Sequence, residues 1–191
     1  MTPTLRTSIV ALAALAIASS ASATVMVEVP LEELVHRADA IVHGTVLSSR
    51  TRLEMREGAL EPQTLTTIRV HEWIAGSGGE TVTLRELGGT WQGGGVRYDG
   101  TPEYAPGEEV VVFLERRPFA PYDLRTLEMV QGKFIVRHGV PGVPAQVLRD
   151  LSGVAFVRWA EGRQTIERPG EPPVMDLAAF LEYVRYVRGA R

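Results

Sequence analysis

The chain has 191 residues, a formal net charge of −3 and no cysteine. A mildly acidic chain with interspersed charges lacks the basic patch of a nucleic-acid-binding protein, and the lack of cysteine excludes disulfides and thiol catalysis. Of its 20 lysine and arginine side chains only Lys133 is a lysine, a bias typical of GC-rich bacterial genomes or of selection for arginine. From the negative net charge and the lack of a basic patch we expect no nucleic-acid partner.

Residues 1–23 have the layout of a cleavable secretory signal peptide. Arg6 precedes an apolar run over residues 9–18, and Ala21-Ser22-Ala23 forms an A-x-A cleavage site. The run is about half of the roughly 20 apolar residues that a transmembrane helix needs. The sequence thus predicts export to the periplasm or the medium, no membrane anchor, and one mature domain over residues 24–191.

The mature chain opens with a predicted short helix over residues 30–38. Pro30 suits the first helical position, and Glu32 and Glu33 suit the positive end of the helix dipole.

Strand-like runs follow. Gly44 lies inside the first run, where an isolated glycine often marks a bulge or a close backbone approach. The continuous apolar run Val110–Leu114 predicts a strand covered on both faces. Gln131-Gly132 predicts a hairpin turn between two runs. The runs cover residues 40–48, 65–74, 80–87, 109–115, 125–130, 133–137 and 155–160.

The chain ends with a predicted amphipathic helix, from Asp176 as N-cap to Arg188. Short strands with helices only at the ends predict a mostly β domain, a small OB-like barrel or a sandwich. The helix is expected to dock through Leu177, Phe180, Leu181, Val184 and Val187. A single β core is expected from Ile41, Val46, Ile68, Val70, Val82, Leu84, Val111 and Phe113.

Three of the segments resemble the netrin-type module shared with tissue inhibitors of metalloproteinases. Residues 38–46 (ADAIVHGTV) resemble its ADxVxxGxV first strand, residues 66–76 (TTIRVHEWIAG) its threonine-rich second strand, and residues 106–113 (PGEEVVVF) its GxxYLVF strand. The resemblance covers about residues 38–115 and implies a five-stranded OB-type barrel. The family's inhibitors use disulfides and an N-terminal cysteine, so in this cysteine-free chain the inhibitory chemistry has no residue to act through.

The sequence predicts no catalytic residue, no metal site and no cofactor. No histidine pair among His36, His43, His71 and His138 has the spacing of a zinc motif, and we expect exposed strand histidines. The G-x-S-x-G nucleophile elbow fails at Ala75, and the glycine run at residues 93–95 lacks the ending of a phosphate-binding loop. Adjacent carboxylates such as Glu108-Glu109 are expected to be solvated.

The segment Gly88–Gly107 is the predicted functional surface. Its seven glycines make it costly to order, and a connection between strands needs only a few residues. In this hypothesis Trp91, Tyr98 and Tyr104 offer contact area, while Arg97 and Asp99 orient a partner. The alternative is that Trp91 folds back over the end of the barrel and the glycines only permit that path.

The favoured interpretation is a secreted, non-enzymatic binding module that contacts a protein or an extracellular polymer. The alternatives left open are a secreted hydrolase with an unidentified site and a structural component of the envelope.

Overall fold

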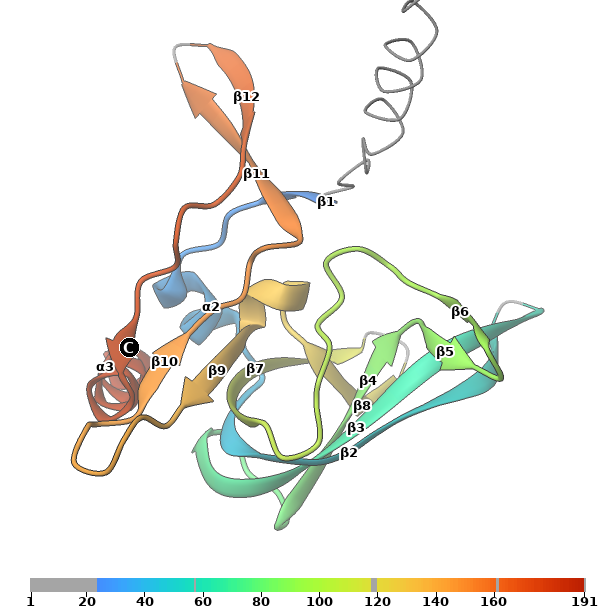
Figure 1. Ribbon diagram of the computed structural model, residues 1–191, viewed down its shortest axis with the longest axis horizontal. Coiled ribbons are helices and arrows are strands. Elements are labelled where there is room, and N and C mark those ends of the chain that lie inside the picture. The colour runs from blue at the N-terminus through green and yellow to red at the C-terminus, as the bar shows by residue number, and fades with distance from the viewer. Residues whose placement is uncertain (1–23, 57, 118–119, 161, 191) are drawn as a thin grey trace, which may run out of the picture.

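The structure, a computed structural model, describes residues 24–56, 58–117, 120–160 and 162–190. It is mostly β, with two α-helices that lie on one side of a large sheet (Figure 1). The predicted signal peptide, residues 1–23, lies outside the described residues. No helix in the described ranges is long and apolar enough to cross a membrane.

The elements follow one another along the chain with strands in the middle and a helix near each end. The helices are α2 (Leu31–Arg37), the short 3-10 helix η1 (Met129–Gly132) and α3 (Leu177–Gly189). The strands are β1 (Thr24–Val27), β2 (Ala40–Arg56), β3 (Ala59–Ala75), β4 (Thr81–Leu87), β5 (Gly89–Trp91), β6 (Gly94–Val96), β7 (Glu109–Arg117), β8 (Ala120–Thr126), β9 (Lys133–Arg137), β10 (Gln146–Leu148), β11 (Val154–Ala160), β12 (Arg163–Glu167) and β13 (Met175–Asp176).

The main sheet has the strand order β13-β10-β9-β7-β2-β3-β4-β8, with an additional pairing of β7 with β8. Most neighbours are antiparallel, but β4 pairs with β8 in parallel through Leu84 and Leu124. The pairings therefore run from β7 through β2, β3, β4 and β8 back to β7. Separately, β11 lies between β1 and β12, and β5 pairs with β6.

Strand β7 is buried on both faces, as its apolar run predicts. Val110, Val111, Val112, Phe113 and Leu114 are all fully buried. Successive side chains of a strand point to opposite faces, so this strand contributes to two separate cores.

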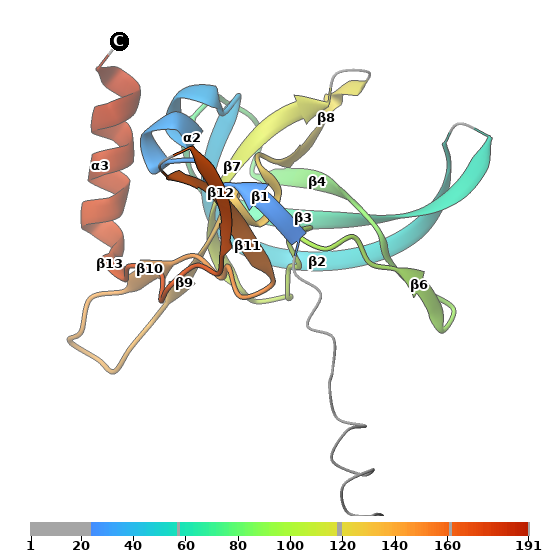
Figure 2. The same cartoon turned by 90° about the horizontal axis from the view of Figure 1, so that it is seen from above.

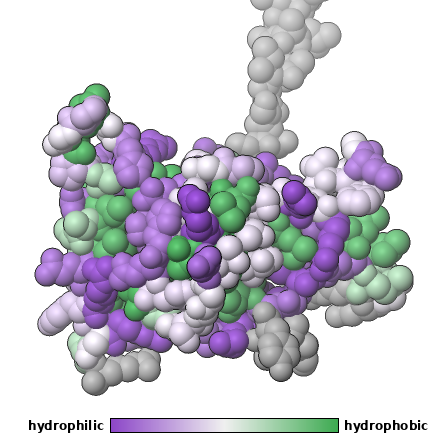
Figure 3. Space-filling view, turned by 90° about the horizontal axis from the view of Figure 1, so that it is seen from below, coloured by the Kyte–Doolittle hydropathy of each residue, from purple (hydrophilic) through white to green (hydrophobic). Residues whose placement is uncertain are grey.

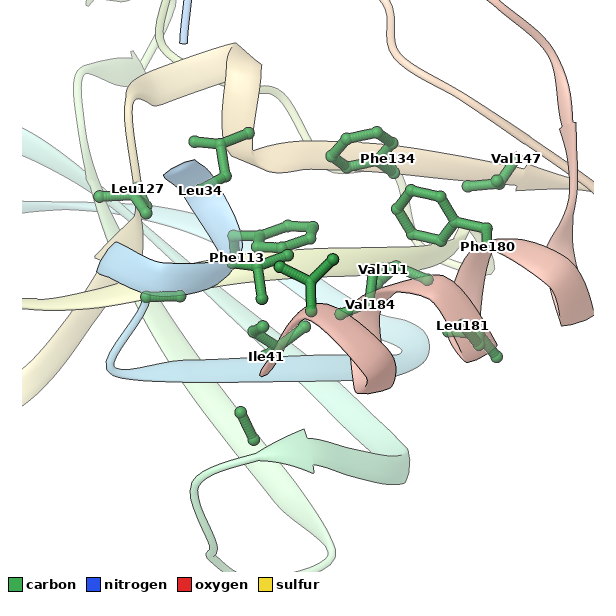
Figure 4. Packing of buried hydrophobic residues seen from close by; sticks show 14 of the residues in the cluster. Leu34, Ile41, Val111, Phe113, Leu127, Phe134, Val147, Phe180, Leu181 and Val184 are labelled. Atoms are coloured by element: carbon green, nitrogen blue, oxygen red, sulfur yellow. The ribbon is translucent and has the colours of Figure 1, made fainter. Parts of the chain in front are cut away.

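The expectation of a single β core is therefore wrong. One core lies between the sheet and the two helices, and Figure 4 shows Phe113, Phe134 and Phe180 meeting there. The other lies on the opposite face of β2 and β7. The predicted core residues divide between them: Ile41, Val111 and Phe113 belong to the first, Val46, Ile68, Val82 and Leu84 to the second, and Val70 packs half-buried against the second.

The C-terminal helix docks as predicted. Asp176 caps α3, and its carboxylate accepts a hydrogen bond from the Ala179 amide at 3.0 Å. Phe180, Leu181, Val184 and Val187 are buried and Leu177 is half-buried, all in the helix-side core. Figure 2 shows α3 beside α2 at one end of the molecule. The predicted N-terminal helix is also present, as α2.

The predicted hairpin at Gln131-Gly132 is wrong. Strands β8 and β9 pair with successive parts of β7, β8 with residues 114–117 and β9 with residues 109–112. Gln131 is buried because its side-chain amide binds the N-terminal segment: Oε1 accepts from the Val29 amide at 2.8 Å, and Nε2 donates to the Val27 carbonyl at 3.0 Å. In place of the expected hairpin turn, residues 129–132 form η1, and the Gln131 side chain ties it to the N-terminal segment.

Candidate functional site

The predicted binding segment, residues 88–107, is partly a β-hairpin. Strands β5 and β6 pair through the turn Gln92-Gly93, where both residues have positive φ, 48° and 82°. The hairpin lies against Thr51 of β2 and Thr64 of β3, whose hydroxyl oxygens are 3.2 Å apart. A Cβ at Gly89 would come within 2.2 Å of Thr51 Oγ1 and 2.4 Å of Thr64 Oγ1, so glycine is required for this close approach.

Two hollows flank the segment. The larger, of about 600 Å³, is lined by residues of β2 and β3, the end of β4 and the hairpin; the smaller, of about 490 Å³, reaches β9 and the start of β11. Both share a wall made by residues 101–104 and Arg97. On the face drawn in Figure 3, apolar side chains form separate patches among polar ones. The linings of the two hollows themselves combine hydroxyl, charged and apolar side chains, so the candidate surface is concave and of mixed polarity.

Of the five predicted contact residues, Arg97, Tyr98, Asp99 and Tyr104 line one or both hollows, whereas Trp91, at the end of β5, lines neither. Trp91 and Tyr98 are each 39% exposed, and Tyr98 lines the larger hollow. Arg97 is exposed and forms an ion pair with Glu103 at 3.2 Å. Asp99 lines the smaller hollow.

Tyr104 is buried, only 6% exposed, and so differs from the expected surface ring. Its hydroxyl lies 2.6 Å from Thr126 Oγ1. Thr126 in turn donates to Glu86 Oε1 through its amide, at 2.8 Å, and its hydroxyl, at 2.7 Å. Since the Thr126 hydroxyl hydrogen goes to Glu86, Tyr104 must donate to Thr126. Tyr104 therefore belongs to a buried chain of hydrogen bonds between the two hollows.

Burial shifts the pKa values of two members of this hydrogen-bonded group, Glu86 and Tyr104. It raises the pKa of Glu86 above its ordinary value, and the hydrogen bonds from Thr126 offset this only in part. It also raises the pKa of Tyr104 well above 10, with a further contribution from the nearby charge of Glu86. Lys133 lies over the Tyr104 ring at 4.7 Å and binds both Glu108 oxygens, at 2.7 and 2.9 Å.

A second group of polar side chains lies on the helix side of the sheet. His43 Nε2 is 2.8 Å from Glu109 Oε1, and His138 Nε2 is 2.8 Å from Glu109 Oε2. The His43 and His71 rings stand edge to face with centroids 5.0 Å apart. We call His43, His71, His138 and Glu109 the histidine cluster. It holds three of the four histidines of the chain.

A β-bulge brings His71 to His43. Register places His43 opposite Glu72 but Gly44 opposite Val70, so His71 is the extra residue of β3. The bulge breaks the alternation that would direct His71 to the opposite face. It also confirms the significance of Gly44, where a Cβ would lie 2.4 Å from the Arg69 carbonyl oxygen.

Glu109 joins the cluster from β7, where it pairs opposite Thr45 and is thus a diagonal neighbour of His43. Burial alone would raise the pKa of Glu109, but the hydrogen bonds with His138 and His43 prevail, and the pKa lies below its ordinary value. The carboxylate is thus held ionised between two imidazoles. The sequence carried no spacing signal for this arrangement because its members come from four separate segments.

Comparison of the chain with family models, curated proteins and solved structures finds no match.

Proposed function

We propose that this protein is an exported, non-enzymatic binding module that holds an extracellular polysaccharide in the hollows beside residues 88–107. One observation carries the proposal: two hollows, of about 600 and 490 Å³, meet at the wall formed by this segment. Concave sites with a few convergent polar groups are the usual form of ligand sites.

The chemistry of the larger hollow favours a sugar polymer. Its lining combines the hydroxyls of Ser49, Thr51 and Thr64 with the half-exposed ring of Tyr98. Hydroxyls donate and accept hydrogen bonds, and an aromatic ring offers a flat apolar face. A sugar ring presents both kinds of group, whereas a protein partner more often meets a flatter surface.

The scaffold in this proposal is an OB-like barrel of β2, β3, β4, β8 and β7. The support is the series of pairings that returns from β8 to β7, together with the parallel pairing of β4 with β8. OB-type barrels of this size bind oligosaccharides in some families, which is an analogy of fold only.

The hydrolase alternative depends on Glu86, a carboxylate with a raised pKa that lines the larger hollow. Both Thr126 donors already bind one oxygen of Glu86. The other carboxylate of this lining, Glu103, is exposed and paired with Arg97. This arrangement supports a structural role for Glu86 rather than an acid and base pair.

The test is co-sedimentation of the mature protein with peptidoglycan, cellulose and chitin. Tyr98→Ala, which removes the aromatic ring that lines the larger hollow, should lower the affinity for the bound polymer about tenfold, equivalent to about 1.4 kcal/mol. Tyr186→Ala and Trp159→Ala are matched controls, since both side chains are exposed and lie outside the hollow linings.

Unchanged affinity in Tyr98→Ala would refute the location of the site. Failure of all three polymers to bind, with capture of a protein instead, would refute the substrate class. Release of soluble sugar that stops in Glu86→Gln would establish the hydrolase.

A further inference from the structure

We propose that His43, His71 and Glu109 form a zinc site, in which His138 positions the Glu109 carboxylate. This site lies on the helix side of the sheet and is independent of the polysaccharide proposal.

The donor atoms already converge. One ligand atom from each of His43, His71 and Glu109 lies within 4.8 Å of the other two. Zinc bonds of about 2.0–2.2 Å in tetrahedral geometry place neighbouring ligand atoms about 3.3 Å apart. The donor atoms therefore need to close by at most about 1.5 Å, and His71 is the exposed member whose ring would turn toward the ion, in exchange for its Nε2 hydrogen bond with Thr45 Oγ1.

Three adjacent strands hold the ligands. His43 lies on β2, His71 on the bulge of β3 and Glu109 at the start of β7, and side chains on paired strands are placed more precisely than side chains on loops. The side chains of His43 and Glu109 are only 13% and 19% exposed, which restricts their rotamers. Exposure of His71 leaves a path for the ion to enter.

The donor set selects the metal. Two imidazoles and one carboxylate suit zinc and its transition-metal neighbours, whereas Mg²⁺ and Ca²⁺ prefer a shell of oxygen atoms. Three protein ligands leave a fourth position for water. When zinc occupies His43 Nε2, a hydrogen at that nitrogen moves to Nδ1, and the hydrogen bond to Glu109 Oε1 is exchanged for two bonds to the ion.

The neighbouring side chains indicate which carboxylate, Glu72 or Glu109, is the metal ligand. Glu72 adjoins His71, but Arg185 of α3 binds both of its oxygens, at 2.6 and 2.7 Å. In the part of the chain that the structure describes, the two oxygens of Glu109 face His43 and His138 rather than an arginine or a lysine. A hydrogen bond from His138 to Oε2 holds the carboxylate so that Oε1 faces the ion, a second-shell arrangement common in metal sites.

The experiment is isothermal titration calorimetry of the chelator-treated mature protein with zinc chloride, with magnesium chloride as the counter-probe. We expect one zinc per chain at micromolar affinity or better, and no heat with magnesium. Replacement of a ligand, in His43→Ala, His71→Ala or Glu109→Gln, should weaken zinc binding by at least about 100-fold, the upper range for second-shell losses.

His36→Ala is the matched control, because His36 lies on α2 outside the cluster. His138→Ala should weaken zinc binding about tenfold, and His138→Gln, which keeps an N–H donor, should restore it. His71→Ala keeps the test valid if the more buried variants fail to fold. Cobalt substitution adds a spectroscopic readout, since tetrahedral cobalt absorbs strongly in the visible range.

Absence of zinc binding, binding only at millimolar zinc, or equal affinity in His71→Ala and the parent protein would each overturn the site. Equal losses in His36→Ala and His71→Ala would do the same. Failure of His138→Gln to restore binding would overturn the positioning role of His138.

Discussion

Removal of the Phe180 ring tests whether α3 belongs to the folded core or is a detachable tail. Phe180 is fully buried, and its ring centroid lies 4.8 Å from that of Phe134. Truncation of a buried phenylalanine to alanine costs about 3–5 kcal/mol. Phe180→Ala also loses an aromatic pair worth about 0.5–1.5 kcal/mol, so we expect the upper part of that range, about 4–5 kcal/mol.

Urea denaturation followed by far-UV circular dichroism measures this loss. With a slope of about 2 kcal/mol per molar urea, a loss of 4–5 kcal/mol lowers the midpoint by about 2 M. Tyr186→Ala is the matched control, because this aromatic side chain of the same helix is 72% exposed and should change stability by less than about 0.5 kcal/mol. A loss below about 1 kcal/mol in Phe180→Ala would refute the docking of α3.

Three further predictions follow from other parts of the molecule. Gly44→Ala should destabilise the fold by about 1–3 kcal/mol by urea denaturation, since its Cβ would meet the Arg69 carbonyl oxygen at 2.4 Å; unchanged stability would contradict the close approach at the bulge. Burial raises the pKa of Glu86 above its ordinary 4.5, so the folded chain binds its proton more tightly than the unfolded chain. Its contribution to stability is therefore highest below pH 4.5 and is lost as pH rises through the raised pKa, and Glu86→Gln should show a smaller decline over this window in urea titrations at several pH values. The exported protein should begin at Thr24 by intact-mass measurement, and a retained Arg6 would contradict cleavage.

Local patterns predicted the elements whose environment is set by their own sequence. Helix α3 follows from apolar spacing and an N-cap aspartate, and β7 follows from its uninterrupted apolar run, Val110–Leu114. Both signals reside within one segment, so no knowledge of distant contacts is needed.

Features that depend on pairing were missed. The two cores could not be told apart because the face that each residue of β2, β3 and β4 presents depends on registers and bulges. The hairpin predicted at Gln131-Gly132 was wrong for a similar reason. The Gln131 side chain hydrogen-bonds to the backbone of Val27 and Val29, about 100 positions earlier in the chain, and no local pattern reveals that contact.

The histidine cluster is the clearest case. Strict alternation directs His71 away from His43, and the bulge reverses that direction. Gly44 carried the available signal, since a glycine within a strand often marks a bulge. A glycine alone does not indicate which side chains the bulge brings together, because that depends on the register of β2 and β3.

The adjacent residues Glu108 and Glu109 take part in different proposed sites, one on each face of the sheet. Both were expected to be solvated, yet their side chains are only 17% and 19% exposed. Glu108 binds Lys133 at the smaller hollow, and Glu109 joins the histidine cluster on the opposite face. Since the sheet stands between the two carboxylates, Tyr98→Ala should leave zinc binding unchanged, and His71→Ala should leave polymer binding unchanged. A double variant should then show both losses in full, because sites without shared partners behave additively.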